Sequence, residues 1–477
     1  MSLHYDVIVI GAGPAGLSSA ALLGDLGLKV LVLDEQEKVG GQIYRNIQGA
    51  DEGQLEFFGA DYREGLQLAD NFTKAPVTYE NHAQVWQVEP EGWVSYSRNG
   101  ESKRVRANYI LAATGAMERP MPIPGWTLPG VMGAGAVNNL AKEAGLTPEG
   151  RVILAGSGPL LLLEASLLVK KGVEIAAILE TGPMVPPAGD FPKIAPRLPK
   201  ALLRWDFLFK GVGMLMDIKK SKAPHYKGVT RIQARGKDQL EHVSAMSGDK
   251  ELVYPADMLL LHFGVVPNTH IYRQMGCKMV WEKEQRYWYP ACDKWGRTNF
   301  ERVFAAGDGT RVQGGLAARY EGQLAALEIA SCLGMITRDE RDGLAAPIHK
   351  ALSHDGLPRP FVDSLYAPKS QDFLFDDDTL LCRCENVTVG EVRKMVAEGV
   401  RDVNEVKAIT RCGMGPCQGR MCGPALAEIV GAELSLSPDK VGQLNIRPPV
   451  KLVSMAEIAA MDLGEGGTAA GNWLLKK

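Results

Sequence analysis

The chain has 477 residues, of which 45% are hydrophobic and 23% charged, and its formal net charge is −3. This length allows two or three domains with sizeable cores, and the small net charge argues against nucleic acid or an anionic membrane as the main partner. The first predicted strand starts within six residues of Met1, which leaves no room for a signal peptide, and no uncharged apolar run reaches the ~18–20 residues of a membrane helix. We therefore expect a cytoplasmic protein that does not span the membrane.

The N-terminal segment carries a dinucleotide-binding pattern. A β-branched run at residues 6–10 predicts a buried parallel strand, which leads into a glycine-rich turn and a helix to about Gly27. In the turn, Gly11 permits the tight bend, Gly13 lets the backbone approach a pyrophosphate, and Gly16 lets helix and strand pack closely. The helix N-terminus presents unpaired N–H groups and a positive dipole end to the phosphates. The turn residues expected to bind the cofactor are Gly11, Gly13, Pro14, Ala15 and Gly16.

A second predicted strand, at residues 29–33, ends at two acidic residues. Asp34 lies 18 residues after Gly16, where a carboxylate can accept hydrogen bonds from an adenosine ribose, and Glu35 follows it. A glycine-rich turn alone is weak evidence. With a strand before it, a helix after it and an acid closing the second strand, it favours dinucleotide binding over an ordinary βαβ turn.

Three later stretches resemble the FAD-binding signatures of the two-dinucleotide-binding-domain flavoproteins, the glutathione-reductase-like superfamily. They are residues 40–42, 110–115 and 303–309. The resemblance implies that Asp308 bonds the ribityl chain, that the backbone of Val85 meets the adenine, and that a helix over 315–329 directs its N-terminus at the flavin. Asp308 could also simply cap that helix. The further residues expected at FAD are Gly41, Gln42, Val85, Ala113, Thr114, Gly115, Gly307 and Asp308.

Residues 151–265 repeat the opening pattern in a damaged form. A strand at 152–154 leads into a second glycine-rich turn, but its third fingerprint position is Leu161, where a glycine or alanine normally lets helix and strand approach. Glu180 closes the next strand and is still placed for a ribose. We therefore expect at most a structural adenine nucleotide here and disfavour NAD(P)H as hydride donor. Residues 183–199 are studded with proline, which indicates an insertion that contacts a partner.

Five of the eight cysteines fall between residues 382 and 422. In a cytosolic chain this density indicates a metal site rather than disulfides, and the Cys-x-Cys half favours an iron–sulfur cluster over zinc or an unligated group. The stretch resembles the bacterioferritin-associated-ferredoxin-like [2Fe–2S] domain. We expect Cys382, Cys384, Cys412 and Cys417 as ligands. Cys422 enters a predicted helix and is expected to be unligated, although two extra residues between the thiols keep it open as a substitute for Cys412.

The predicted fold class is α/β, with two Rossmann-like domains and a small C-terminal [2Fe–2S] domain. The expected boundaries are 1–135 and 266–344 for the FAD domain, 136–265 for the NAD(P)-type domain, 345–378 for a covering linker, 379–432 for the cluster domain and 433–477 for a tail.

This order of domains resembles the α subunits of heteromeric bacterial amino-acid and amine dehydrogenases, such as the opine oxidases, proline and hydroxyproline dehydrogenases and hydrogen cyanide synthase. Residues 40–45, 264–270 and the cysteine block carry the resemblance most specifically. It implies an oxidoreductase subunit that relays electrons from a C–N bond oxidised on a D-amino-acid-oxidase-like β subunit to an acceptor such as a quinone. The resemblance also allows for peripheral membrane association, an FMN at the subunit interface and a small ferredoxin-like γ subunit. No catalytic acid–base pair is evident in the chain itself.

Two other functions compete with this one. A stand-alone NAD(P)H-dependent ferredoxin or rubredoxin reductase would use the second nucleotide domain, and an iron–sulfur delivery protein would leave the FAD site idle. A disulfide reductase would need a Cys-x-x-Cys or Cys-x₄-Cys pair after Gly41, and the sequence has none there.

Overall fold

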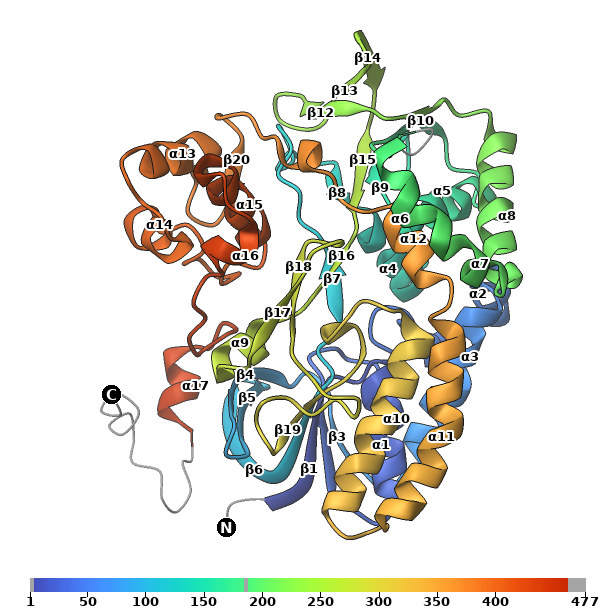
Figure 1. Cartoon of the computed structure of the whole chain (residues 1–477), viewed down its shortest axis with the longest axis vertical. Helices are drawn as coiled ribbons and strands as arrows, with labels where there is room; N and C mark the ends of the chain where they lie inside the picture. Colours follow the sequence, from blue (N-terminus) through green and yellow to red (C-terminus); the bar gives the residue numbers. More distant parts are fainter. Residues whose placement is uncertain (1–3, 184–187, 462–477) are drawn as a thin grey trace.

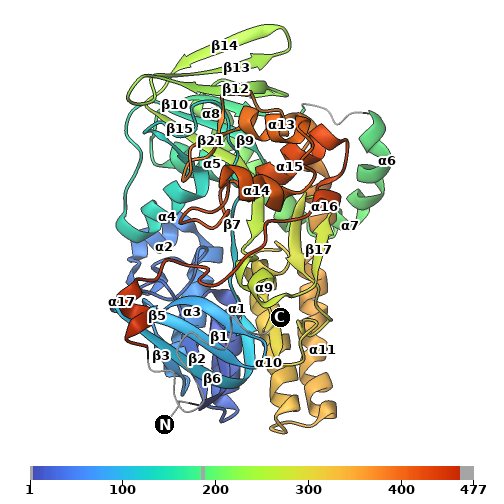
Figure 2. The ribbon, with the colours of Figure 1, turned by 90° about the vertical axis from the view of Figure 1, so that its left-hand side faces the viewer.

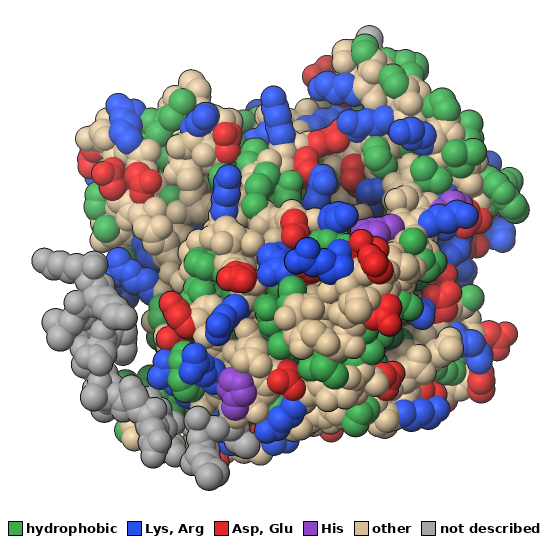
Figure 3. Space-filling model, turned by 60° about the horizontal axis from the view of Figure 1, so that its bottom comes forward, with side chains coloured by type: hydrophobic (Ala, Val, Ile, Leu, Met, Phe, Trp, Pro, Cys, Tyr) green, Lys and Arg blue, Asp and Glu red, His purple; other side chains and the backbone are tan. Residues whose placement is uncertain are grey.

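The computed structural model of the protein describes residues 4–183 and 188–461. Figure 1 shows three parts: the FAD-type domain at the bottom, the second nucleotide domain at upper right and the C-terminal domain at upper left. Both signs of charge are interspersed over the face seen in Figure 3, in keeping with the small net charge. Among the helices of the described residues, none combines the length and apolar composition that crossing a bilayer requires.

The FAD-type domain is built on a seven-stranded sheet. Apolar runs at β1 and β2 are buried on both faces, as expected for parallel strands under helices. The strands in spatial order are β3 (Thr78–Glu80), β2 (Val30–Leu33), β1 (His4–Ile10), β6 (Glu101–Ala112), β5 (Trp93–Arg98) and β4 (Gln84–Glu89), with β19 (Val303–Ala305) also paired to β6. One face packs against α1 (Pro14–Asp25), α3 (Ala60–Lys74) and α10 (Gly315–Cys332).

The chain returns to this sheet after the second domain, because β19 pairs in parallel with β6. Apolar side chains of helix α9 (His270–Met275) and of the antiparallel strands β4 and β5 pack with those on the other face of β1 and β2. A hairpin of β17 (Met279–Glu282) and β18 (Tyr287–Pro290) precedes the return. The carboxyl ends of β1, β6 and β19 therefore meet at one edge, which is where ligands bind in such sheets.

The second nucleotide domain has a five-stranded parallel sheet flanked by helices. Its strands in spatial order are β11 (His225–Lys227), β10 (Ile175–Glu180), β9 (Val152–Ser157), β15 (Met258–Phe263) and β8 (Val131–Gly133). Its helices include α4 (Ala134–Ala144), α5 (Pro159–Lys170) and α8 (Trp205–Ser221), and a three-stranded antiparallel sheet of β12 (Thr230–Arg235), β13 (His242–Ser247) and β14 (Lys250–Pro255) extends it.

Two expected boundaries need correction. The second domain begins before residue 136, because β8 already pairs with β15 of its sheet. The linker expected from residue 345 starts later, because residues 338–355 form helix α11 (Arg338–Asp355), which runs through Pro347. Thr337 and Glu340 form a capping box at the start of α11, and α12 (Arg359–Leu365) follows. The prolines of residues 345–378 predict a linker, but the first of them, Pro347, lies inside a helix.

The C-terminal domain contains a short β20 (Leu380–Cys382), β21 (Val387–Thr388) pair and the helices α13 (Val389–Ala397), α14 (Val403–Thr410), α15 (Gly423–Leu434) and α16 (Pro438–Val441). Its apolar residues are continuous with the core of the second domain, so the two pack as one body. An Arg286–Glu428 ion pair ties α15 to the loop between β17 and β18. The chain then descends along the molecule to α17 (Met455–Ala459), which lies beside β6 (Figure 2).

Candidate functional site

A pocket of about 470 Å³ opens at the carboxyl edge of the FAD-type sheet. Every residue expected at FAD lines it except Gly16. The predicted residues in its wall are Gly11, Gly13, Pro14, Ala15, Asp34, Glu35, Gly41, Gln42, Val85, Ala113, Thr114, Gly115, Gly307 and Asp308. Sequence segments from five separate parts of the chain thus meet around one cavity, whose volume suits a bound organic cofactor.

The glycines of the first turn are required by close backbone approaches. Gly11 has φ +105°, and a Cβ there would lie 2.3 Å from the carbonyl oxygen of Ala113. A Cβ at Gly16 would lie 1.8 Å from the carbonyl oxygen of Gly11. Gly16 therefore lets helix α1 pack closely against the turn, and it does not itself line the pocket. This cradle fits a pyrophosphate, because backbone N–H groups can reach the ligand only where side chains are absent.

Asp34 organises the turn as well as lining the pocket. Its carboxylate accepts hydrogen bonds from the backbone N–H of Ala12 at 2.5 Å and of Gln36 at 2.7 Å. Burial raises the pKa of Asp34, and the Ala12 N–H opposes that rise. Its neighbour Glu35 forms an ion pair with Lys451 at 2.6 Å.

Asp308 lies between the end of β19 and the start of α10. Its Oδ1 accepts hydrogen bonds from the backbone N–H groups of Gln313 (2.7 Å) and Gly314 (2.8 Å), the residues just before the helix. Asp308 therefore orders the entry to α10 and also lines the pocket. The N-terminus of α10 reaches the pocket as well, through Gly315 and Ala318. Such a helix end can stabilise negative charge on a reduced flavin.

Glu321, in the second turn of α10, is a half-buried acid next to the pocket. Its Oε2 accepts from the Gly307 N–H at 2.8 Å and its Oε1 from the Gln313 amide at 3.0 Å. Burial raises the pKa of Glu321 to about 7, although the Gly307 N–H opposes the rise. The folded protein therefore prefers the protonated carboxyl at mildly acid pH.

This burial predicts a pH-dependent stability. Since the folded pKa of Glu321 exceeds its ordinary value, its contribution is fully present below pH ~4.5 and is lost as pH rises through about 7. Glu321→Gln should remove this pH dependence. In the unaltered protein it should change the free energy of unfolding by up to about 3 kcal/mol between the low-pH and high-pH limits. Urea unfolding at pH 5 and pH 7.5 measures it, with the exposed Glu56→Gln as control. An unchanged pH profile in Glu321→Gln would contradict the assignment.

Two cationic residues of the C-terminal part enter the FAD pocket, and the sequence analysis missed both. Arg420 and Lys451 line it together with His270 of α9. His270 Nε2 lies 2.9 Å from the carbonyl oxygen of Gln418, and an Arg420 guanidinium N–H donates to the carbonyl of Cys417 at 3.2 Å. The cysteine loop therefore forms part of the FAD pocket wall. His270 lies in a stretch that carried the family resemblance, but no local pattern marked Arg420 or Lys451.

The structure groups the five C-terminal thiols into a buried set of three and a more exposed pair. The sulfur atoms of Cys382, Cys412 and Cys422 lie within 4.8 Å of one another, and all three residues are buried. Hydrogen bonds from the Cys412 and Cys422 thiols lower the pKa of Cys382. Cys384, which is exposed, and Cys417, which is half-buried, form a second contact through their thiols. This set of soft donors fits a [2Fe–2S] cluster.

Cys422 occupies the N-cap position of α15, and this position turns its sulfur toward Cys382 and Cys412. Its place at a helix start was the reason for expecting it to be unligated. Cys412 instead follows the C-terminal end of α14, whose last helical residue is Thr410. A helix N-terminus stabilises a thiolate and a helix C-terminus destabilises it. Hydrogen bonds with Cys382 raise the pKa of both thiols in the metal-free protein. The helix ends distinguish them, because only Cys422 lies at the end where the helix dipole favours a thiolate ligand.

In the second nucleotide domain, Leu161 and Glu180 both lie where a nucleotide would bind, but each side chain already contacts other residues of the protein. Leu161 is fully buried in the core between α5 and the sheet. Glu180, at the end of β10, contacts His225 at 2.9 Å and Lys227 at 3.6 Å. Its carboxylate is therefore neutralised by the protein itself, which weakens the case for a ribose contact.

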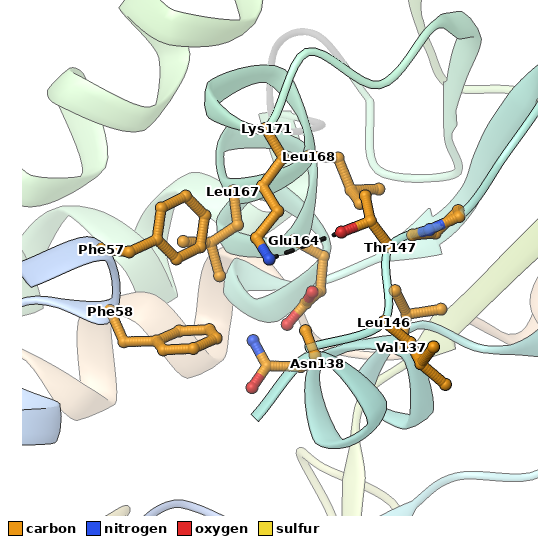
Figure 4. A pocket seen from close by; sticks show the side chains of 12 residues that line it. Phe57, Phe58, Val137, Asn138, Leu146, Thr147, Glu164, Leu167, Leu168 and Lys171 are labelled. Atoms are coloured by element: carbon orange, nitrogen blue, oxygen red, sulfur yellow. Dashed lines mark hydrogen bonds between the residues drawn. The ribbon is translucent and has the colours of Figure 1, made fainter. Parts of the chain in front are cut away.

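A small cavity of about 20 Å³ lies between α2 (Glu52–Phe58), α4 and α5. Figure 4 shows Glu164 and Asn138 pointing into it beneath the Lys171–Thr147 hydrogen bond. Burial raises the pKa of Glu164 to about 8, and its Oε1 has no hydrogen-bond partner among the described residues. The cavity is large enough for one water molecule.

Known proteins with this sequence pattern confirm the domain types. The family described as pyridine nucleotide-disulphide oxidoreductase matches residues 5–325, and the BFD-like [2Fe-2S] binding domain matches residues 380–432. An opine oxidase subunit from Agrobacterium tumefaciens (strain Ach5) is 39% identical, covering 96% of this chain and 92% of its own. Hydrogen cyanide synthase subunit HcnB of Pseudomonas protegens is 30% identical, covering 88% and 90%.

Among solved structures, L-proline dehydrogenase from P. horikoshii superimposes with a TM-score of 0.69, covering 95% of this chain and 79% of that one. At 19% identity this likeness concerns the fold alone. The expected FAD and [2Fe–2S] cofactors and the α/β fold are thereby confirmed. By sequence and by domain order, the chain belongs to the family of FAD- and [2Fe–2S]-containing flavoprotein subunits that includes those of opine oxidase and, in HcnB, of hydrogen cyanide synthase.

Proposed function

We propose that the chain is the electron-transfer subunit of a multisubunit dehydrogenase that oxidises a C–N bond of an amino-acid-like donor. The observation that carries the proposal is the shared wall of the two cofactor sites. Arg420 lies in the cysteine loop and also lines the FAD pocket, and His270 joins the two through Gln418. Relatives named as subunits of opine oxidase and hydrogen cyanide synthase support the division of labour.

The chemistry divides between cofactors and protein. FAD, when bound, accepts electrons in pairs or singly, and a [2Fe–2S] cluster accepts one at a time. The chain holds the dinucleotide with the Gly11–Gly16 turn, orders the entry to α10 through Asp308, and places the Arg420 cation beside the flavin pocket. A fixed cation there favours extra negative charge on either centre.

For the cluster we propose Cys382, Cys384, Cys417 and Cys422 as ligands. The first three are those expected from the sequence, and Cys422 replaces Cys412 because of its helix N-terminal position. Backbone N–H groups of Gly413 and Glu385 point at Cys382 and would stabilise the charge of the cluster.

Substrate oxidation is assigned to a partner. We propose a β subunit with its own flavin, which forms the imine, and an acceptor such as a quinone downstream. The direct test reconstitutes the chain with a flavoprotein encoded by a neighbouring gene. Amino-acid-dependent dye reduction should require both proteins. Oxidation of the donor by this chain alone would refute the proposal.

Helix α8 supplies a face for such a partner, next to the segment in which a contact was expected. Trp205, Phe209, Val212 and Met216 follow one another at helical spacing on one side of α8, and each is at least half exposed. The segment before it forms α6 (Phe191–Ile194) and α7 (Leu198–Leu202), while residues 184–187 of the expected insertion lie outside the described part. A row of this kind suits a helix packed into a partner's groove.

A negative charge within this apolar row of α8 should weaken the binding of the partner subunit. We expect Phe209→Asp to lower the affinity for the partner at least roughly tenfold while FAD content stays unchanged, because a buried aromatic often dominates an interface. Co-purification of the two subunits measures it. Val253→Asp, on a similarly exposed apolar residue of β14, is the control and should bind normally. Normal assembly of Phe209→Asp would place the interface elsewhere.

The reductase alternative makes a distinct prediction. Since Leu161 fills the space of a fingerprint glycine and Glu180 is already ion-paired, NADH and NADPH should bleach the flavin only slowly and incompletely. Anaerobic stopped-flow mixing at the flavin absorption band measures this, with dithionite as the positive control. Rapid, complete bleaching by either nucleotide would favour the stand-alone reductase.

A further inference from the structure

A second, open groove of about 600 Å³ lies beside the cysteine loop. One wall is α14 with its C-terminal Arg411, and the facing wall is the extended segment 445–453 that leads toward α17. The floor is formed by the cysteine loop. The lining residues used below are Lys407, Arg411, Pro416, Gln418, Arg447 and Lys451.

The groove is positively charged. Four cationic side chains line it, namely Lys407, Arg411, Arg447 and Lys451, and none of its described lining residues is acidic. Arg411 and Lys451 each form one ion pair, with Glu385 and Glu35 respectively. Lys407 donates only to the Asn445 carbonyl, at 3.0 Å.

Lys407 and Arg447 therefore form no ion pair within the described part of the chain. Burial lowers the pKa of Lys407, and the nearby Arg447 and Arg273 lower it further. These like charges remain close together without a protein carboxylate between them. Arg447 is exposed and Lys407 is half-buried, so both cations remain accessible to an anion from solvent.

The groove also borders the accessible side of the cluster site. Pro416 and Gln418, the residues on either side of Cys417, both line it. Cys417 and Cys384 are the thiols with solvent exposure, whereas the other three are buried. Lys451 lines both this groove and the FAD pocket, so the groove lies next to both cofactor sites. An acceptor bound here would meet the cluster at its least insulated edge.

We propose that this groove binds a small anionic electron acceptor, held by Lys407 and Arg447 through carboxylate or phosphate groups, and that it is the exit for electrons from the cluster. The inference rests on the proposed electron-transfer function and places the anionic acceptor between the cluster and a final acceptor such as a quinone. In the step itself the reduced cluster loses one electron, the acceptor gains that electron, and no bond or proton moves. Pro448, Pro449, Leu452 and Val453 supply an apolar side against which the rest of the acceptor can lie.

The test compares two small acceptors of opposite charge. The holoprotein is photoreduced anaerobically and mixed with ferricyanide, an anion, or with a ferrocenium cation, at low and high ionic strength. In Lys407→Gln/Arg447→Gln, the rate constant for cluster oxidation by ferricyanide should fall about tenfold at low salt, while that by ferrocenium stays equal or rises. The difference should largely vanish near 1 M salt.

Control variants distinguish the loss of positive charge in the groove from structural damage to the protein. Lys219→Gln/Lys220→Gln removes two exposed cations from α8, far along the chain from the groove, and should leave both rates unchanged. Arg447→Gln alone, at an exposed position, should reproduce part of the effect even if the double variant folds poorly. Inorganic pyrophosphate, which is redox-inert, should compete with ferricyanide in the unaltered protein and much less in the double variant.

Two results would overturn the inference. An equal fall for both acceptors would indicate a structural effect, and an unchanged ferricyanide rate would exclude the groove as the exit. A cluster that neither acceptor oxidises in the unaltered protein would instead refute the electron-transfer function itself.

Discussion

Replacing Cys422 by serine should remove the [2Fe–2S] cluster, whereas Cys412→Ser should retain it. Both thiols lie next to Cys382, but Cys422 caps the N-terminus of α15 and Cys412 follows the C-terminus of α14. The opposite dipole ends stabilise and destabilise a thiolate respectively. Since a cluster needs four thiolates, losing one ligand should cost most of the bound iron.

Iron content and the paramagnetic signal of the reduced cluster measure the effect. Cys382→Ser should lose both in any assignment, and Cys332→Ser, an exposed cysteine outside the C-terminal domain, should keep both. If Cys412→Ser loses the cluster and Cys422→Ser keeps it, the ligand set expected from the sequence is correct. FAD should remain bound in every variant, because none of these thiols lines its pocket.

Gly16→Ala should abolish FAD binding. A methyl group there would lie 1.8 Å from the carbonyl oxygen of Gly11, so α1 must move away from the turn. The clash is with backbone, which cannot rotate aside as a side chain can, and overpacking of this kind costs about 1–3 kcal/mol or more. The displaced turn would no longer direct its N–H groups at the pyrophosphate.

Flavin stoichiometry after purification, and the dissociation constant after adding FAD back, measure the loss. The matched control is Gly211→Ala in α8, where an added methyl group meets no atom within 4 Å. It should bind FAD normally and unfold at an equal or slightly higher temperature, because alanine favours a helix over glycine. Full flavin occupancy in Gly16→Ala would show that the turn tolerates a shift of α1.

The FAD site illustrates how much a sequence can specify through local rules. The Gly11–Gly16 turn and Asp34 were predicted from spacing, and in the structure Gly11, Gly13 and Asp34 line one pocket. Asp308 and Val85 were predicted from a resemblance, and both line the same pocket. Strand, turn and helix patterns are short-range, so their signal survives in the order of residues.

Element boundaries were less well predicted where prolines carried the argument. The prolines of residues 345–378 suggested a linker, but the capping box at Thr337 starts a helix that continues through the first of them, Pro347. The domain boundary near residue 135 failed for another reason. Strand β8 has only three residues, and its membership is decided by pairing with β15, more than a hundred residues away.

The remaining features of the cofactor sites depend on contacts between segments that lie far apart in the sequence. Arg420 and Lys451 reach the FAD pocket because the C-terminal domain shares a core with the second domain and its tail descends along the first. Neither residue belongs to a motif, so periodicity could not mark it. The sequence by itself determined a dinucleotide site and a thiolate-rich metal site, because glycine turns and cysteine spacing are local patterns, and family resemblance specified FAD and [2Fe–2S]. Only the tertiary structure decided how the cofactor sites meet and which helix end faces each thiol, because these depend on long-range packing that no local pattern records.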